Sequence, residues 1–107
     1  MSVFQMTAGD PPHTGVLTFS EPGPPPADGA VFSDNLGLAT VALAADLVTW
    51  TITLVAGGGP VAGAAPMIAN ITYTGTSVPP DAGPVQVAPL VLTVVAIPAA
   101  ETGQFNP

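Results

Sequence analysis

Residues 47–55 read LVTWTITLV, and this stretch indicates the fold class of the chain. Apolar residues alternate with threonines along it, which is the period of two of a β-strand that buries one face. We expect Trp50, the only tryptophan, to be buried in the core between two sheets. The outward positions Thr49, Thr51 and Thr53 carry no charge, although exposed positions are usually rich in Lys, Glu and Arg.

Similar short runs of Val, Ile, Leu and Thr recur along the 107 residues, between segments rich in Pro and Gly. They predict strands at residues 3–7, 15–20, 30–33, 36–43, 47–55, 67–75 and 85–97. The last strand should be interrupted at Pro89, which has no N–H to donate. We expect one all-β domain over 1–107, an immunoglobulin-like β-sandwich with short N- and C-terminal arms. A jelly roll or a small barrel is the alternative.

The chain has no Lys or Arg and seven acidic residues, for a net charge of −7. Nucleic acid and anionic lipid are bound through basic side chains, so we expect neither as a partner. Gly and Pro interrupt the uncharged stretches 47–80 and 82–100, so we expect no membrane span. Without a base in its own chain, each carboxylate is solvated, holds a cation or meets a basic partner. The acids are Asp10, Glu21, Asp28, Asp34, Asp46, Asp81 and Glu101.

Three features could carry chemistry, and a structural interpretation is favoured for each. His13 is the only histidine, and although Asp10 is near, no nucleophile accompanies them, so we expect a loop histidine. The glycines of 57–59 lack the lysine and the helix of a phosphate loop, which favours a hairpin connection. Asp28 and Asp34 lack the spacing of a calcium loop, which favours turns. We therefore expect no enzymatic activity, no metal and no cofactor.

Residues 89–96 read PLVLTVVA, a strand that is apolar on both faces and has Thr93 as its one polar residue. Such a strand is buried on both faces, so it is central in its sheet or covered by another subunit. Phe105 lies beyond this strand, with no local core to enter. We expect an interface that includes Val3, Phe4, Thr49, Thr51, Thr53, Val91, Val95 and Phe105.

In overall character this small, acidic, cysteine-free chain, with segments such as LVTWTITLV and PLVLTVVA, resembles the decoration (cement) proteins of tailed-bacteriophage capsids. The resemblance implies a non-enzymatic virion protein, made in the host cytoplasm and located on the capsid exterior. The implied partners are a major capsid protein with basic surface groups and further copies of the chain, as a trimer. Two alternatives stay open. One is another virion part, such as a head fibre or tail module, and the other is a cell-surface adhesion or carbohydrate-binding sandwich.

Overall fold

The computed structural model describes residues 2–19, 24–76, 83–98 and 103–106, so Glu21, Asp81 and Glu101 lie outside the described residues. The described residues form seven β-strands and no helix. The strands are β1 (Ser2–Thr7), β2 (His13–Val16), β3 (Ala30–Ser33), β4 (Ala39–Leu43), β5 (Thr49–Leu54), β6 (Met67–Thr74) and β7 (Leu90–Val95). The all-β prediction is confirmed.

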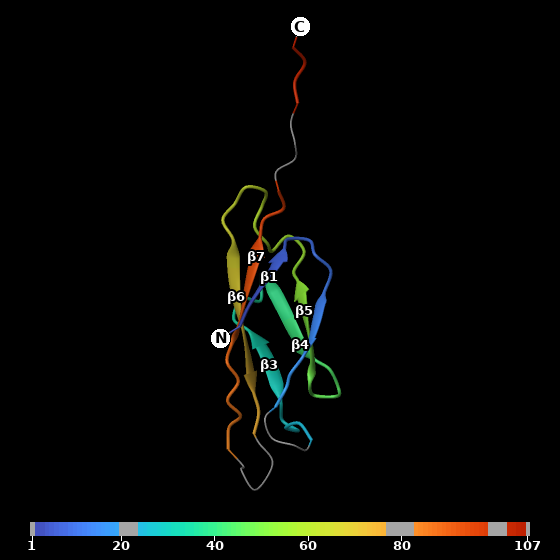
Figure 1. Cartoon of the computed structure of the whole chain (residues 1–107), viewed down its shortest axis with the longest axis vertical. Helices are drawn as coiled ribbons and strands as arrows, with labels where there is room; N and C mark the ends of the chain where they lie inside the picture. The colour runs from blue at the N-terminus through green and yellow to red at the C-terminus, as the bar shows by residue number, and fades with distance from the viewer. Residues whose placement is uncertain (1, 20–23, 77–82, 99–102, 107) are drawn as a thin grey trace.

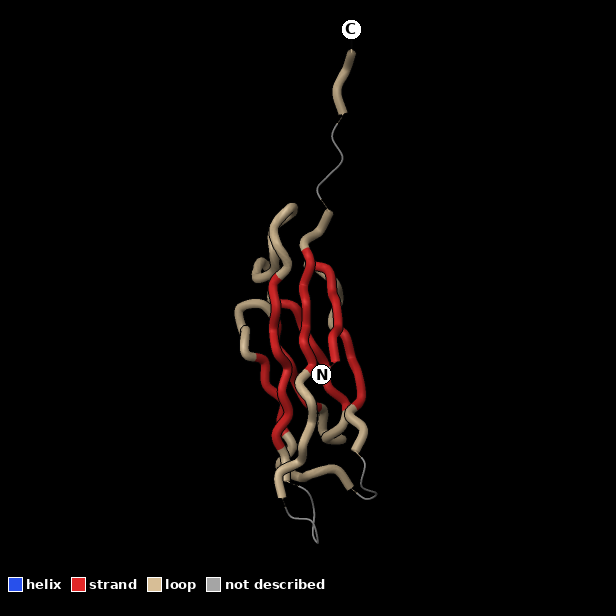
Figure 2. The backbone as a smooth tube through the Cα atoms, turned by 60° about the vertical axis from the view of Figure 1, so that its left-hand side comes forward, coloured by secondary structure: helices blue, strands red, loops and turns tan. Residues whose placement is uncertain are grey.

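The strands form two sheets, ordered β1-β7-β6-β3 and β2-β5-β4 (Figure 1). All neighbours are antiparallel except β1 and β7, which run parallel. The two sheets pack as layers, and their strands run roughly along the long axis of the molecule (Figure 2). β3 and β4 are in contact across the layers and close one side of the sandwich. The predicted β-sandwich is confirmed; its immunoglobulin-like character stays a prediction.

The core lies between the sheets and is built by the period of two. Ile52 of β5 and Leu92 and Val94 of β7 are fully buried, and the next residue of each strand points outward. Leu38 is fully buried although it lies in the turn before β4. Each such side chain contributes roughly 1.5–3 kcal/mol by burial. These residues hold the two layers together and so fix which side chains face outward.

Trp50 lies between the sheets and packs against the core, but it is only half-buried and so is not the buried core residue that was expected from the sequence. The core cluster that it contacts includes Ile52. Gly15 of β2 pairs with Trp50, and a Cβ on Gly15 would lie 2.6 Å from the indole Cε2. Glycine is therefore required there, because the ring covers the backbone of β2 where another side chain would stand.

The strand bounds differ from the expected ones in every strand except β3, and three of the differences have a clear cause. β2 begins at His13 and ends at Val16, whereas residues 15–20 were expected; its pairing with β5, and not its own apolar pattern, decides its bounds. β4 begins at Ala39, because the Asn35 carbonyl accepts hydrogen bonds from the N–H groups of Leu38 and Ala39 and forms a turn. β7 begins at Leu90, directly after Pro89, as the missing N–H of proline predicts.

Candidate interaction surfaces

The outer face of the four-stranded sheet exposes several large apolar side chains. We call it the apolar face, and its members are Val3, Phe32, Ile68, Val91 and Val95. Val3 is 71%, Phe32 52% and Ile68 53% exposed. The strand register places Val3 beside Val91 and Ile68 beside Thr93, so these side chains share one face. Polar residues that face the same way lie among them, namely Gln5, Asn70, Thr72 and Thr93. Large apolar side chains exposed on one face indicate a site of interaction with another molecule.

β7 is central in this sheet, between β1 and β6. Its outward residues Val91, Thr93 and Val95 are half-buried by their neighbours, whereas Leu92 and Val94 are completely buried below. The central position accounts for part of the two-faced apolar pattern of this strand. The remaining exposure of Val91 and Val95 leaves apolar area that a partner can cover.

The outer face of the three-stranded sheet is different, because it is covered by hydroxyl groups. We call it the threonine face, and its members are Thr14, Val16, Ala42, Thr40, Thr49, Thr51 and Thr53. The hydroxyls of Thr14 and Thr51 are hydrogen-bonded at 3.1 Å, and that of Thr40 donates to the Thr53 carbonyl at 3.5 Å. Val16, 65% exposed, is the one large apolar side chain on this face.

The eight interface residues expected from the sequence are thus divided among four places. Val3, Val91 and Val95 lie on the apolar face, and the three threonines of β5 lie on the threonine face. Phe4 is directed into the sandwich, where it packs against the core and its ring centroid lies 4.3 Å from that of His13. Phe105 lies in the terminal segment 103–106 beyond the end of the sandwich, where it is fully exposed (Figure 1).

Phe32 and Ile68, two prominent residues of the apolar face, were not expected from the sequence. The alternation in β6 was visible, since Ile71 and Tyr73 are buried and Ile68 has the opposite parity. Phe32 pairs with Thr72, an outward residue, and this pairing could be known only from the register of β3 against β6. Parity identifies an exposed apolar residue within a strand, but the sheet order decides which residues gather on one face.

The described carboxylates are held in turns. Asp46 accepts hydrogen bonds from the N–H groups of Val48 and Thr49 and from the Thr49 hydroxyl. Asp28 accepts from the N–H and the hydroxyl of Thr76, both at 2.8 Å. These donors stabilise the charged form and lower the pKa of Asp46 and of Asp28 below the ordinary value of 3.8. The carboxylates therefore need no base to be satisfied.

Asp34 borders the apolar face at the β3 edge. Its carboxylate accepts from the Asn70 backbone N–H at 2.7 Å and from the Asn70 side-chain amide at 2.8 Å. These bonds, led by the side-chain one, lower the pKa of Asp34. The seven strands themselves contain no Asp or Glu. The apolar face is therefore neutral, with a negative charge at its rim.

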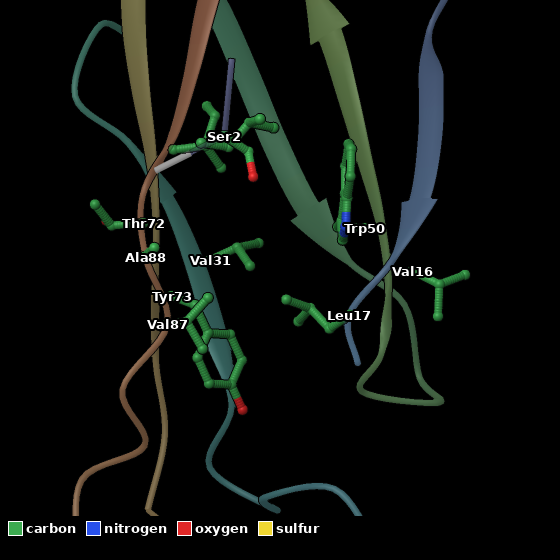
Figure 3. Close-up of a pocket in the computed structure, with 11 residues that line it drawn as sticks. Ser2, Val16, Leu17, Val31, Trp50, Thr72, Tyr73, Val87 and Ala88 are labelled. Carbon is green, nitrogen blue, oxygen red and sulfur yellow. The ribbon is translucent and has the colours of Figure 1, made fainter. Parts of the chain in front are cut away.

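A pocket of about 260 Å³ opens between the sheets at the end where Trp50 lies. Figure 3 shows Trp50 and Leu17 on one side of it, and Val31, Tyr73 and Val87 on the other. The Tyr73 hydroxyl is buried and has no hydrogen-bond partner among the described residues. Burial, with a smaller contribution from Asp28, raises the pKa of Tyr73 above 10.0. No carboxylate or imidazole is among the described residues that line this pocket.

His13 was expected to be a loop residue, but it is the first residue of β2. Its ring lies between those of Phe4 and Trp50, at centroid distances of 4.3 and 5.8 Å. The Asp10 carboxylate accepts a hydrogen bond from the Thr7 N–H instead of orienting this histidine. The imidazole therefore serves as a packing group at the open side of the core.

The glycine segment 57–59 lies in a turn, but the expected hairpin connection is wrong, because β5 before it and β6 after it belong to different sheets. Gly58 in this turn is required by packing. The Gly58 N–H donates to the Val55 carbonyl, and a Cβ on Gly58 would lie 3.1 Å from the carbonyl carbon of Gly37. Only glycine allows these two backbone segments to approach so closely. The segment therefore joins two loops of the sandwich.

The described residues contain no group of three or more His, Cys, Asp or Glu side chains placed to hold a metal ion. Among them there is also no helix long and apolar enough to cross a membrane. No family model, curated protein or solved structure matches the chain. The surfaces described above are therefore the basis for a proposal about function.

Proposed function

We propose that this protein is a non-enzymatic structural component that docks onto a larger assembly through its apolar face. The observation that carries this proposal is the exposure of Val3, Phe32 and Ile68 on one side of one sheet. An isolated domain gains nothing from exposing three large apolar side chains together, and contact with a partner would bury them. The absence of charge from the strands supports docking, because the charge of Asp34 lies at the rim of the face, where it can stay solvated or meet a basic group.

The assembly that we propose is the exterior of a bacteriophage capsid, which the protein would decorate. This step rests on the resemblance in size, composition and β pattern to decoration proteins. Asp34 at the rim of the apolar face supports a partner with basic surface groups, since exposed opposite charges steer association and fix its register. A head fibre or a tail module would use the same face and differ in its docking place.

We also propose that the sandwich is immunoglobulin-like in topology. In immunoglobulin domains the two sheets contain strands A-B-E-D and C-F-G. The orders β2-β5-β4 and β3-β6-β7 correspond to B-E-D and C-F-G when the strands are lettered in sequence. β1 departs from that pattern, because it pairs with β7 of the other sheet.

The experiment that tests the proposed function is co-sedimentation of the purified protein with tailed-phage particles from the same source. The proposal expects the protein to pellet with intact particles at a saturable ratio, and negative-stain images to show added density on the capsid. Added density on a fibre or tail would mean that the protein docks onto that part of the virion and not onto the capsid. Absence of binding at micromolar protein would overturn the virion role.

A further inference from the structure

We propose that the free edge of β1 docks onto β1 of a second copy of this chain, so that two sandwiches share one continuous sheet. β1 is the outer strand of the four-stranded sheet, and β7 is the only strand paired with it in the part of the chain that the structure describes. An edge strand presents a row of unpaired N–H and C=O groups that can pair with another strand. This inference goes beyond the proposed function and does not depend on particle binding.

The direction of the backbone groups in β1 follows from two hydrogen bonds. The N–H of Ser2 donates to the Pro89 carbonyl at 3.3 Å, and that of Ala8 donates to the Val95 carbonyl at 2.9 Å. Successive residues of a strand direct their N–H and C=O groups to opposite sides. The even-numbered residues of β1 therefore bond to β7, and the odd-numbered residues face the free edge.

Of these edge-facing residues, Thr7 is already satisfied by the turn that follows β1. Its N–H donates to the Asp10 carboxylate and its carbonyl accepts from the Asp10 N–H, both at 2.9 Å. Val3 and Gln5 have no such partner among the described residues. The edge thus offers two donors and two acceptors, with the Asp10 turn closing one end.

β1 also lacks the features that usually protect an edge strand. Its six residues, SVFQMT, contain no charge, no proline and no glycine. β2 is protected by its length of four residues and by Pro11 and Pro12 before it, and β3 is equally short and lies beside β4. β1 is therefore the longest unprotected edge on the side of the sandwich opposite to β3 and β4.

The arrangement of the free groups favours an identical strand as the partner. In an antiparallel pair with Phe4 of each copy at the two-fold axis, Val3 of one copy lies opposite Gln5 of the other. Each such pair exchanges both N–H···O bonds, which gives four hydrogen bonds in total. The same patch then contacts itself, as an isologous dimer requires. All edge groups left free by the Asp10 turn would be used.

Charge favours this seam as well. Two copies, each with a net charge of −7, can associate closely only where no carboxylates meet. Asp34 lies at the opposite edge of the sheet, about 14 Å from β1 at the usual strand spacing. The two Asp10 turns would lie about 20 Å apart, farther than the screening length of roughly 8 Å at physiological salt.

Sedimentation equilibrium of the full chain, over a range of concentrations, tests the proposal with two variants of one residue. Gln5→Pro removes an edge-facing N–H and no hydrogen bond to β7, and proline is tolerated on an edge. Gln5→Ala is the matched control, because it keeps the N–H and removes only the side chain. We expect the wild type and Gln5→Ala to form dimers with similar Kd, and Gln5→Pro to raise the Kd at least about tenfold.

Amide hydrogen exchange of the wild type is the second measurement, in case Gln5→Pro does not fold. The amides of Val3 and Gln5 should become protected as the concentration rises, and those of Phe4 and Met6 should be protected throughout. A monomer at every concentration, a trimer, or a dimer unaffected by Gln5→Pro would overturn the proposal. The proposal would also be overturned if the dimer persisted in Gln5→Pro but was lost when residues 103–107 were removed. That result would assign the contact to the C-terminal arm.

The proposal and the proposed function fail separately. A monomer that still binds particles would overturn the β1 seam alone. A dimer that binds no particle would overturn the virion role alone. The molar mass from sedimentation equilibrium also distinguishes a two-fold dimer from the trimer that the resemblance to decoration proteins implies.

Discussion

The apolar face and the threonine face are the outer sides of two sheets that share one core, yet they present different chemistry. Val3, Phe32 and Ile68 stand exposed on the apolar face, whereas hydroxyl groups cover most of the threonine face. Threonine fits a strand and hydrogen-bonds to water, so the threonine face is stable when solvated. Lack of charge is thus common to both faces, and exposed apolar area is what distinguishes a docking surface.

A substitution on either face must affect docking without disturbing the shared core. The loss of stability caused by a core substitution is therefore the reference for the others. Ile52→Ala should destabilise the protein by about 2–5 kcal/mol, because Ile52 is fully buried between the sheets. Urea unfolding measures this loss. The outward neighbour Thr53→Ala is the control and should change stability by less than about 0.5 kcal/mol. A loss below about 1 kcal/mol for Ile52→Ala would contradict the place of Ile52 in the core.

The second prediction concerns the carboxylates, which lie in the turns. Hydrogen bonds lower the pKa of Asp28, Asp34 and Asp46 in the folded state. Their contribution to stability is therefore present above the unfolded pKa of about 3.8 and is lost as the pH falls through the lower folded values. The Tm should be steady near neutral pH and fall below about pH 4.

Thermal unfolding across the pH range measures this, with Asp46→Asn as the comparison. Because the asparagine side chain does not titrate, the acid-side fall should be shallower in that variant. A wild-type Tm that does not change between about pH 7 and pH 3 would contradict the hydrogen-bonded turns.

The sequence predicted much of the fold because its strands alternate regularly. The strand at 30–33 was predicted with the bounds that the structure has, and the break at Pro89 followed from the missing N–H. β2 was misplaced because its residues HTGV are held by pairing with β5 and not by an apolar pattern. Trp50 was expected to be buried in the core, but it is half-buried and lines a pocket between the sheets.

The candidate surfaces were predictable only in part. Val91 and Val95 were found because their strand is apolar on both faces, which a single strand reveals. Phe32 was missed, because its place beside β6 depends on pairing between distant segments. The partners of Asp28 and Asp34 were missed for the same reason, since Thr76 and Asn70 are 48 and 36 residues away.

The smallest expected effect comes from exchanging residues between the two faces. Ile68→Thr places a threonine on the apolar face, and Thr53→Ile places an isoleucine on the threonine face, both at exposed positions. In the isolated protein each should change the free energy of unfolding by less than about 0.5 kcal/mol, as exposed substitutions usually do. A loss above about 2 kcal/mol for Ile68→Thr would mean that the apolar face is already covered within the molecule.

The most direct test of the central claim, that the apolar face is the docking surface, is particle binding by matched charge variants. Ile68→Lys places a charge on the apolar face, and Thr53→Lys places the same charge on the threonine face. Co-sedimentation should show that Ile68→Lys weakens binding at least about tenfold, because the ammonium group must be desolvated on docking. Thr53→Lys should bind as the wild type does. Equal binding by both variants, or loss with Thr53→Lys alone, would contradict the account.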